Sequence, residues 1–562
     1  MLPNKWGQGQ LFVFSALDGT SLYSDDLVGT LSGDRIGIRF HTKVARELAV
    51  VGYHAHDLVF RAVTSDYIRA ELSGNRTIRI LYHDTHLVIG DLPEDACAVV
   101  FPEGKAKITE IDGVQLQDTG DGEYTALAAS ETKFAFAYAR SAEEAVRKAK
   151  NGLCTDIDAS EQKKCAFFEK NTLSDDCKYN YLYSKCLSVM KSQLYSPEEE
   201  YDRIWSTPDR LPHKNLWLWD SVFHALGHRN IDGKLAEDLI LDIFVGQYDN
   251  GMIPHMANIY LRSNITQPPV IAWGAWNVYQ TTHNKEFLRT VFSCNGRFLS
   301  WCQRERKPAP ENLYVWHTAE DITCRCDESG MDNSPRFDNV VHLQAIDFSC
   351  FMANEMRHMA RIAKELGEDP AEDLEQFESI KAAINAKLWD AEDGFYYDYD
   401  LDNERIHKVE AVSSFLPLFA GVCDKKQADS LIKWLLNPET FWTAFPIPSI
   451  SVRDKTFGSD MWRGPVWINY NYMIIQGLRE YGYADLADEI LHKTLDVINE
   501  WYQKDGTLYE FYNSENKFSP RLIERKGPVV EPYNPAIRYQ SIRDYGWSCT
   551  LTCDLIAQTY GK

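Results

Sequence analysis

The chain has 562 residues, 12% of them aromatic, and a formal net charge of −23 at pH 7. Its length exceeds the roughly 250–300 residues at which a single hydrophobic core stops growing, so two domains are expected. The acidic balance argues against nucleic acid and anionic membrane surfaces as partners, because both require a basic binding surface. A highly anionic polymer is also disfavoured as substrate, although one local arginine could still hold a small anionic group.

The N-terminal segment and the cysteines indicate a cytoplasmic protein. Residues 1–6 have neither the basic start nor the apolar run of a signal peptide. No apolar stretch reaches the length of a membrane span. The 13 cysteines are scattered, and Cys324 and Cys326 are too close together for a zinc knuckle. We therefore expect buried free thiols, no metal and no cofactor, and leave open whether the chain forms a homo-oligomer.

The first third of the chain has the pattern of β-structure. Residues 37–44 and 77–82 alternate between apolar and polar side chains, and turn-forming clusters such as 116–122 separate such runs. Short strands with frequent turns predict an N-terminal β-sandwich over residues 1–150. The charged segment 151–187 is expected to be a helical connector.

From about residue 180 the apolar residues recur at helical spacing. Twelve helical segments are expected to begin near Tyr181, Trp217, Leu235, Pro269, Lys285, Val340, Pro370, Glu410, Lys425, Pro465, Ala484 and Tyr545. Residues 466–475 are apolar on most faces, whereas residues 484–491 are amphipathic. Buried helices paired with half-exposed ones predict an inner and an outer ring. Residues 188–562 are therefore expected to form an all-α (α/α)6 barrel.

Polar segments just ahead of the predicted helices lie where such a ring would carry its functional loops. In residues 216–224, Trp219 could form a platform for a sugar while Asp220 binds its hydroxyls, but Asp220 could equally cap the helix. A second segment contains His255, which could be an ordinary structural histidine. It also contains Gln267, which two following prolines hold on a stiff backbone.

Residues 327–338 form the most unusual segment of the chain. Several acids, Gly330, Arg336 and a proline within a dozen residues do not fit a plain helix or strand. The alternatives are a polar turn and a calcium loop, although the acid spacing lacks the EF-hand pattern.

Two further segments carry candidate functional residues. In residues 460–469, packing accounts for Trp462 and Trp467 but less easily for Arg463. Glu510 stands among three aromatic residues, and apolar surroundings can exclude competing water from a carboxyl group. The alternative for Glu510 is an ordinary exposed glutamate on a loop.

Taken together and in order, these segments resemble glycoside hydrolase family 63 and its mannosylglycerate-hydrolase-like branch, which is similar to the trehalase families. The matching motifs lie at residues 217–221, 251–255, 267–269, 328–336, 388–398, 437–449 and 463–469. The resemblance covers roughly residues 190–560 and leaves the N-terminal region uncovered.

The resemblance implies an (α/α)6 barrel that hydrolyses α-glycosides with inversion. It assigns the general acid to Asp332 and the general base to Glu510. The acid would protonate the leaving oxygen while the base activates a water on the opposite face of the sugar. Substrate-binding residues are expected at Trp219, Asp220, His255, Gln267, Gly330, Arg336, Trp462, Arg463, Trp467 and Trp547. We therefore predict an exo-acting α-glucosidase whose partner is a small carbohydrate.

One departure from the family is an inserted segment, residues 519–543, that separates Glu510 from the last predicted helix. A long proline-bearing loop can cover a pocket or build an outer subsite. Two other interpretations stay open, an inverting phosphorylase and a non-catalytic sugar-binding protein. Glu510 argues against the first, which needs a phosphate site in place of a base, and the presence of both carboxylates argues against the second. The sequence does not distinguish glucose from mannose or identify the leaving group.

Overall fold

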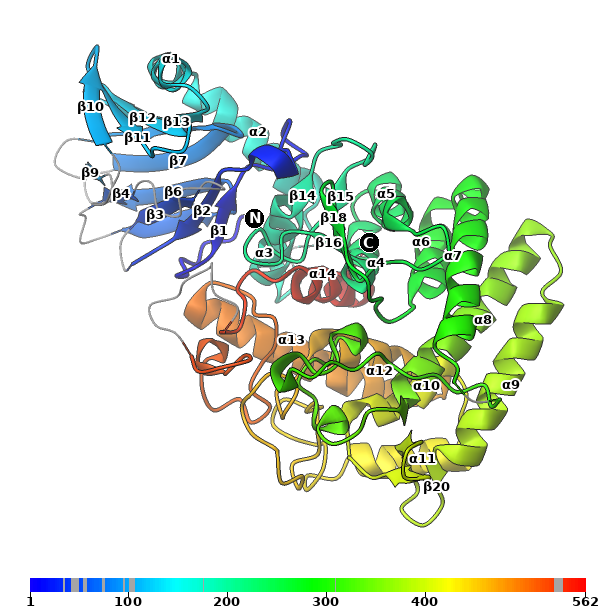
Figure 1. The fold of residues 1–562 in the computed structure, drawn as a ribbon. Coiled ribbons are helices and arrows are strands. Elements are labelled where there is room, and N and C mark those ends of the chain that lie inside the picture. Colours follow the sequence, from blue (N-terminus) through cyan, green and yellow to red (C-terminus); the bar gives the residue numbers. More distant parts are fainter. Residues whose placement is uncertain are drawn as a thin grey trace.

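A computed structural model describes residues 1–33, 36–41, 50–53, 58–72, 76–93, 97–100, 107–174, 176–308, 310–529 and 539–561. The N-terminal part is β-rich and the C-terminal part is helical, as the sequence predicts (Figure 1). No helix within the described residues is long and apolar enough to cross a membrane.

Two antiparallel sheets form the N-terminal part. The smaller sheet has the order β1 (Leu11–Val13), β2 (Val28–Leu31), β3 (Gly37–His41), β4 (Val50–Tyr53) and β9 (Cys97–Val100). The larger has the order β10 (Lys107–Ile111), β11 (Val114–Asp118), β12 (Tyr124–Ala129), β13 (Lys133–Ala139), β8 (Leu87–Asp91), β7 (Arg76–Asp84), β6 (Tyr67–Leu72) and β5 (Val59–Val63). Alternation along β3 buries Ile38 and Phe40, and Phe40 stacks on Phe136 of β13 with 4.7 Å between ring centroids. The two sheets therefore face each other across one shared core.

Two helices follow the last strand. They are α1 (Ala142–Leu153) and α2 (Ile157–Lys170). Ala145 and Ala149 of α1 are buried in a second cluster with Ala135 and Ala137 of β13, so α1 covers the face of the larger sheet that points away from the shared core. The segment 151–187 thus contains the end of α1, all of α2 and the start of the next helix.

Each of the twelve predicted helical segments holds a helix. These are α3 (Asn180–Ser192), α4 (Leu218–His228), α5 (Gly233–Leu241), α6 (Ile271–Thr282), α7 (Lys285–Glu305), α8 (Ile346–Leu366), α9 (Ala371–Lys387), α10 (Leu416–Ala420), α11 (Lys425–Leu435), α12 (Ile468–Glu480), α13 (Ala484–Asp505) and α14 (Gly546–Tyr560). The segment near Glu410 is the weakest, because only a short 3-10 turn and the five-residue α10 form there. Gly421, with φ of 70°, ends α10 in the left-handed conformation that glycine adopts readily.

Six of these helices contact one another in a closed circuit. The circuit runs α4, α6, α8, α10, α12 and α14, and α14 packs back against α4. Nearly every residue of α12 is buried, whereas α13 buries only one stripe and exposes the other to solvent. The difference matches the apolar and amphipathic patterns of the two sequences.

Short strands occur in the connections between helices. They are β14 (Leu194–Tyr195), β15 (Trp205–Ser206), β16 (Leu216–Trp217), β17 (Met256–Asn258), β18 (Leu261–Arg262), β19 (Leu343–Gln344), β20 (Trp389–Asp390), β21 (Phe395–Tyr396), β22 (Asp398–Asp400) and β23 (Arg405–His407). The strand β16 pairs with β17 and so brings the connection before α4 beside the connection before α6.

The two parts of the chain meet at β1, α3 and the end of the inserted segment (Figure 1). Asp544, directly before α14, is buried and pairs with Lys185 of α3 at 2.8 Å. Its other carboxylate oxygen accepts a hydrogen bond from the backbone N–H of Leu11 in β1. The N-terminal part therefore holds the chain in place next to the C-terminal end of the inserted segment.

Candidate active site

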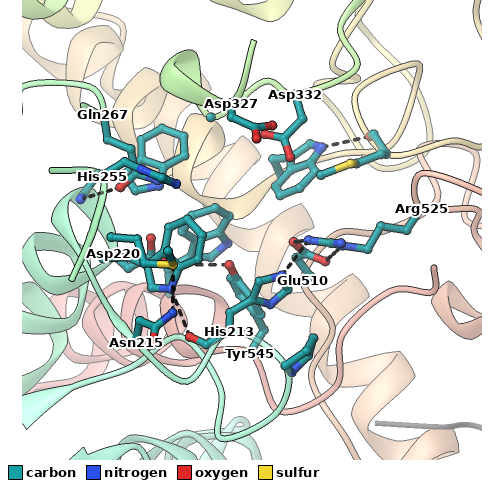
Figure 2. Close-up of a pocket in the computed structure, with 18 of the residues that line it drawn as sticks. His213, Asn215, Asp220, His255, Gln267, Asp327, Asp332, Glu510, Arg525 and Tyr545 are labelled. Atoms are coloured by element: carbon teal, nitrogen blue, oxygen red, sulfur yellow. Dashed lines mark hydrogen bonds and ion pairs between the residues drawn. The ribbon is translucent and has the colours of Figure 1, made fainter. Parts of the chain in front are cut away.

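A cavity of about 310 Å³ lies among the connections that precede five helices of the closed circuit (Figure 2). Nine of the twelve predicted site residues line it: Trp219, Asp220, His255, Gln267, Gly330, Asp332, Trp467, Glu510 and Trp547. Residues more than 300 positions apart in the sequence, such as Trp219 and Trp547, therefore contribute to one site. The volume is at the small end of the range of roughly 300–1,000 Å³ that is typical of small-molecule sites.

The loop that carries Asp332, the predicted general acid, is shaped by a glycine. Gly330 has φ of 72°, and a Cβ atom at this position would lie 2.3 Å from the ring of Trp219. Both the backbone conformation and the contact exclude a side chain. The loop can therefore press against Trp219, and Asp332 lies on the cavity wall.

Two neighbouring acids of the same loop have structural partners. Glu328 is fully buried and pairs with Arg306 at 2.8 Å. Asp338 pairs with Arg463 and does not line the cavity. Asp327 does line it together with Asp332. Among the acids of this loop, the geometry therefore leaves Asp327 and Asp332 as candidates for proton transfer.

Glu510, the predicted general base, lies after α13 and is only 2% exposed. Its two carboxylate oxygens accept hydrogen bonds from Arg525, at 2.7 Å from Nε and 3.1 Å from Nη2. Burial acts against the charge of the guanidinium, but the Glu510 carboxylate raises the pKa of Arg525 above its usual value. Because Arg525 belongs to the inserted segment, the segment reaches directly into the site.

The next residue of the inserted segment contacts the other predicted catalytic carboxylate. The Lys526 ammonium lies 2.5 Å from Asp332 Oδ2 and 2.8 Å from the Cys324 sulfur. Burial works against the charged ammonium, yet the Asp332 carboxylate raises the pKa of Lys526 above its usual value. Lys526 has φ of 56°, a conformation uncommon for residues other than glycine and concentrated at functional sites.

Aromatic side chains form the apolar wall of the cavity. Trp219 meets Trp547 edge to face with 5.2 Å between ring centroids. Trp467 lies 5.8 Å from Trp547 and donates its indole N–H to the carbonyl of Met461. Rings held in this way present fixed surfaces against which the apolar face of a sugar can lie.

Polar side chains fill the remaining wall. Gln267 accepts a hydrogen bond from the backbone N–H of Trp219 at 3.3 Å. Burial raises the pKa of Asp220 well above its usual range, and the nearby Glu510 carboxylate adds to the rise. Burial lowers the pKa of His255 to about 4, although Asp332 opposes the change. At neutral pH His255 is therefore uncharged.

Three residues predicted to bind substrate lie behind the cavity wall instead. Arg336 is fully buried, and its guanidinium is occupied by Asp347 at 2.6 Å and Asp398 at 2.8 Å. Trp462 stacks on the far side of Trp467, with 3.8 Å between ring centroids. The guanidinium of Arg463 is occupied by an ion pair with Asp338, which explains why an arginine stands at this position. These residues support the loops that line the cavity and do not line it themselves.

Several lining residues were not predicted as site residues from the sequence. They are Pro212, His213, Asn215, Trp217, Met256, Asp327, Met461, Arg525, Lys526 and Tyr545. A signal was present for Arg525 and Lys526, because they are adjacent cations ahead of a Gly-Pro pair in the inserted segment. For His213 the signal was weaker, consisting of an Asp four residues earlier in a proline-containing loop.

One group of side chains within the described residues has distances that could suit a metal ion, namely Cys324, Asp327 and Asp332. The Lys526 ammonium already lies among these atoms, 3.9 Å from Asp327 and closer to the other two. We expect dialysis against EDTA to leave the hydrolytic rate unchanged, since a carboxylate pair needs no metal. A loss of activity that zinc or calcium restores would contradict this prediction.

The family described as mannosylglycerate hydrolase MGH1-like glycoside hydrolase domain matches residues 213–548. The chain belongs to this family. It is thus a glycoside hydrolase, and the resemblance to glycoside hydrolase family 63 found in the sequence is confirmed. The matched residues contain every segment that lines the cavity, except Pro212 at its edge.

Curated relatives and solved structures agree with the family. A mannosylglycerate hydrolase from Rubrobacter radiotolerans is 28% identical over 400 residues, covering 54% of this chain and 86% of the relative. One from Thermus thermophilus is 27% identical, covering 53% and 88%. The crystal structure of a GH63 mannosylglycerate hydrolase from Thermus thermophilus in complex with Tris and D-glycerate has 24% identity and a TM-score of 0.55. That match covers 66% of this chain and 99% of the other, which shows a shared fold.

Proposed function

We propose that this glycoside hydrolase is an inverting, exo-acting α-glycosidase, with glucose as the sugar on the non-reducing side. The observation that carries the proposal is the placement of Asp332 and Glu510 on different loops of one small, aromatic-walled cavity (Figure 2). One carboxylic acid can protonate the leaving oxygen while the other activates water. Asp220 and Gln267 would hold hydroxyl groups of the sugar against Trp219.

The same proposal includes the architecture. The closed circuit of six helices and the amphipathic helices outside it support an (α/α)6 barrel over residues 188–562. The two facing sheets support a β-sandwich over residues 1–150.

The stereochemical course of the reaction is the direct test of mechanism. NMR spectra recorded during the first turnovers of an α-glucoside should show the β-anomer of glucose before mutarotation. An α-mannoside of the same leaving group tests the choice of sugar. Initial release of the α-anomer would contradict inversion, and a rate that depends on added phosphate would favour a phosphorylase instead.

We also propose that the cavity is a short pocket closed by the inserted segment. Arg525 and Lys526 line the cavity, which supports a covering role for this segment. Residues 530–538 of the segment lie outside the described residues. A covered pocket excludes water and leaves little space beyond the cleaved bond. In a length series of α-linked oligosaccharides, kcat/KM should therefore fall beyond the disaccharide, whereas efficient cleavage inside long chains would contradict the pocket.

The leaving group is proposed to be small and acidic. Two relatives are mannosylglycerate hydrolases, and here Lys526 presents an ammonium to Asp332 at the side where the leaving oxygen must bind. A carboxylate on the leaving group would attract this ammonium away from Asp332 and free the acid for the glycosidic oxygen.

Lys526→Met should therefore shift the substrate preference of the enzyme from an acidic leaving group towards a neutral one. With matched α-glucosides of glycerate and glycerol, the variant should lose about tenfold or more in kcat/KM on the acidic substrate, about the worth of one charged hydrogen bond. The neutral substrate should be hydrolysed at least as fast as before, because the ammonium no longer competes for Asp332. Equal losses on both substrates would contradict a role in recognising the leaving group.

A further inference from the structure

A buried histidine lies on the Glu510 side of the cavity. His213 lines the cavity with 8% exposure, and Asp209 behind it is fully buried. Asp209 accepts two hydrogen bonds from His213, from the backbone N–H at 3.0 Å and from Nδ1 at 2.9 Å. Both the ring and the backbone of His213 are therefore held by one carboxylate.

The partners of His213 determine the orientation of its ring. An aspartate oxygen facing a ring nitrogen accepts, so Nδ1 carries the hydrogen. The other nitrogen, Nε2, lies 3.4 Å from Nη2 of Arg525. A guanidinium can only donate, so Nε2 must present its lone pair. Each ring nitrogen of His213 therefore faces one partner, and Asp209 and Arg525 together fix the orientation of the ring.

Arg525 connects this pair to the proposed base. Its Nη2 carries two hydrogens, one directed to His213 and the other to Glu510 Oε1, while Nε donates to Glu510 Oε2. The guanidinium is planar, so its contact with His213 fixes the plane in which the other two bonds lie. The side chain of Arg525 is 4% exposed, which leaves it little freedom to rotate.

We propose that Asp209 and His213 position Arg525, and that Arg525 in turn holds the Glu510 carboxylate in the orientation that activates water. The inference rests on the proposed role of Glu510 as base. Arg525 occupies one acceptor direction on each carboxylate oxygen, and the remaining directions can face the cavity.

The residues of the inserted segment that directly precede Arg525 are anchored to a neighbouring loop. The backbone N–H of Glu524 donates to the carbonyl of Ser459, and the N–H of Met461 donates to the carbonyl of Glu524. Ile523 is fully buried beside these contacts. Arg525 therefore approaches Glu510 from an anchored backbone. A contact with a loop of ordinary mobility would not hold a carboxylate in one orientation.

Hydrolysis of α-glucosyl fluoride isolates this side of the site, because fluoride leaves without needing a proton from Asp332. We expect Arg525→Ala to lower kcat by about 100-fold with KM changed by less than about threefold. Added guanidinium chloride at non-denaturing concentration should restore part of kcat, which a purely structural defect would not allow. Arg525→Lys keeps the charge but loses the planar guanidinium, so its kcat should fall between those of the native enzyme and Arg525→Ala. Arg521→Ala, an exposed arginine of the same segment, is the matched control and should be unaffected.

Combining substitutions tests whether His213 acts through Arg525. His213→Ala should lower kcat about tenfold in the native background and less than about twofold when Arg525 is already alanine. Losses that multiply in the double variant, or a fully active Arg525→Ala, would overturn the inference. Should Arg525→Ala fail to fold, Arg525→Lys and its combination with His213→Ala give the same comparison. An active Glu510→Gln would overturn the base assignment itself, whereas an inactive Glu510→Gln beside a fully active Arg525→Ala overturns only the positioning role.

Discussion

Asp332→Asn is expected to leave a folded protein in which hydrolysis of alkyl α-glucosides falls by about 10³-fold or more. An amide cannot deliver the proton that a poor leaving group requires, and general acid catalysis contributes roughly 10²–10⁴-fold. On α-glucosyl fluoride the same variant should retain activity within about tenfold of the native enzyme. Steady-state kinetics on the two substrates measure the difference directly.

The choice between the two acids of this loop needs a matched variant. Asp327 lines the same cavity and faces the same lysine at 3.9 Å. If Asp327 were the acid, Asp327→Asn would show the substrate-dependent loss and Asp332→Asn would not. An equal loss on alkyl glucoside and fluoride in Asp332→Asn would exclude an acid role for Asp332. Circular dichroism and thermal unfolding check that each variant is folded, since Asp332→Asn also removes the partner of Lys526.

Helical periodicity predicted much of the fold because helix burial follows directly from local pattern. Residues 466–475 are apolar on most faces, and α12 is buried almost throughout. Residues 410–420 carried less information, because α10 is too short for periodicity to show and depends on packing against α8 and α12.

The sequence predicted the site residues that a family motif identifies directly. It was less informative for residues whose role depends on which side chains the fold places beside them. Asp332 and Glu510 came from motifs and do line one cavity. Arg336 came from the same motif, yet it neutralises Asp347 from the start of α8 and Asp398 from β22. A buried arginine with two carboxylates cannot be recognised before the fold brings those acids together.

The inserted segment shows the opposite case. Its position beside Glu510 could be seen in the sequence, but the roles of Arg525 and Lys526 could not. Arg525 contacts Glu510 on one loop, and Lys526 contacts Asp332 on another. These contacts depend on the conformation of loops, which has no periodic pattern that a sequence could show. Sequence patterns therefore located the segment, and the structure supplied its chemistry.

Glu510→Gln is expected to abolish turnover on both substrates, by about 10³-fold or more, because water must be activated whatever the leaving group is. This separates the base from the acid, whose loss should spare α-glucosyl fluoride. The substitution also leaves Arg525 buried without its anionic partner, and breaking a buried ion pair can cost about 3–5 kcal/mol. A lower Tm is therefore expected, and the Glu510→Gln/Arg525→Met double variant should recover part of it without recovering activity.

A small nucleophile can replace the missing base and reveal its position. With Glu510→Ala and α-glucosyl fluoride, added azide should enter the space left by the carboxylate and attack without deprotonation. Attack from the Glu510 side of the sugar would yield β-glucosyl azide, which NMR distinguishes from the α product. Azide rescue that gives the α-azide would place the nucleophile on the same face as the leaving group and contradict the assignment of Glu510. Recovery of the β-azide would tie the loss of activity to the base and separate it from the loss of stability.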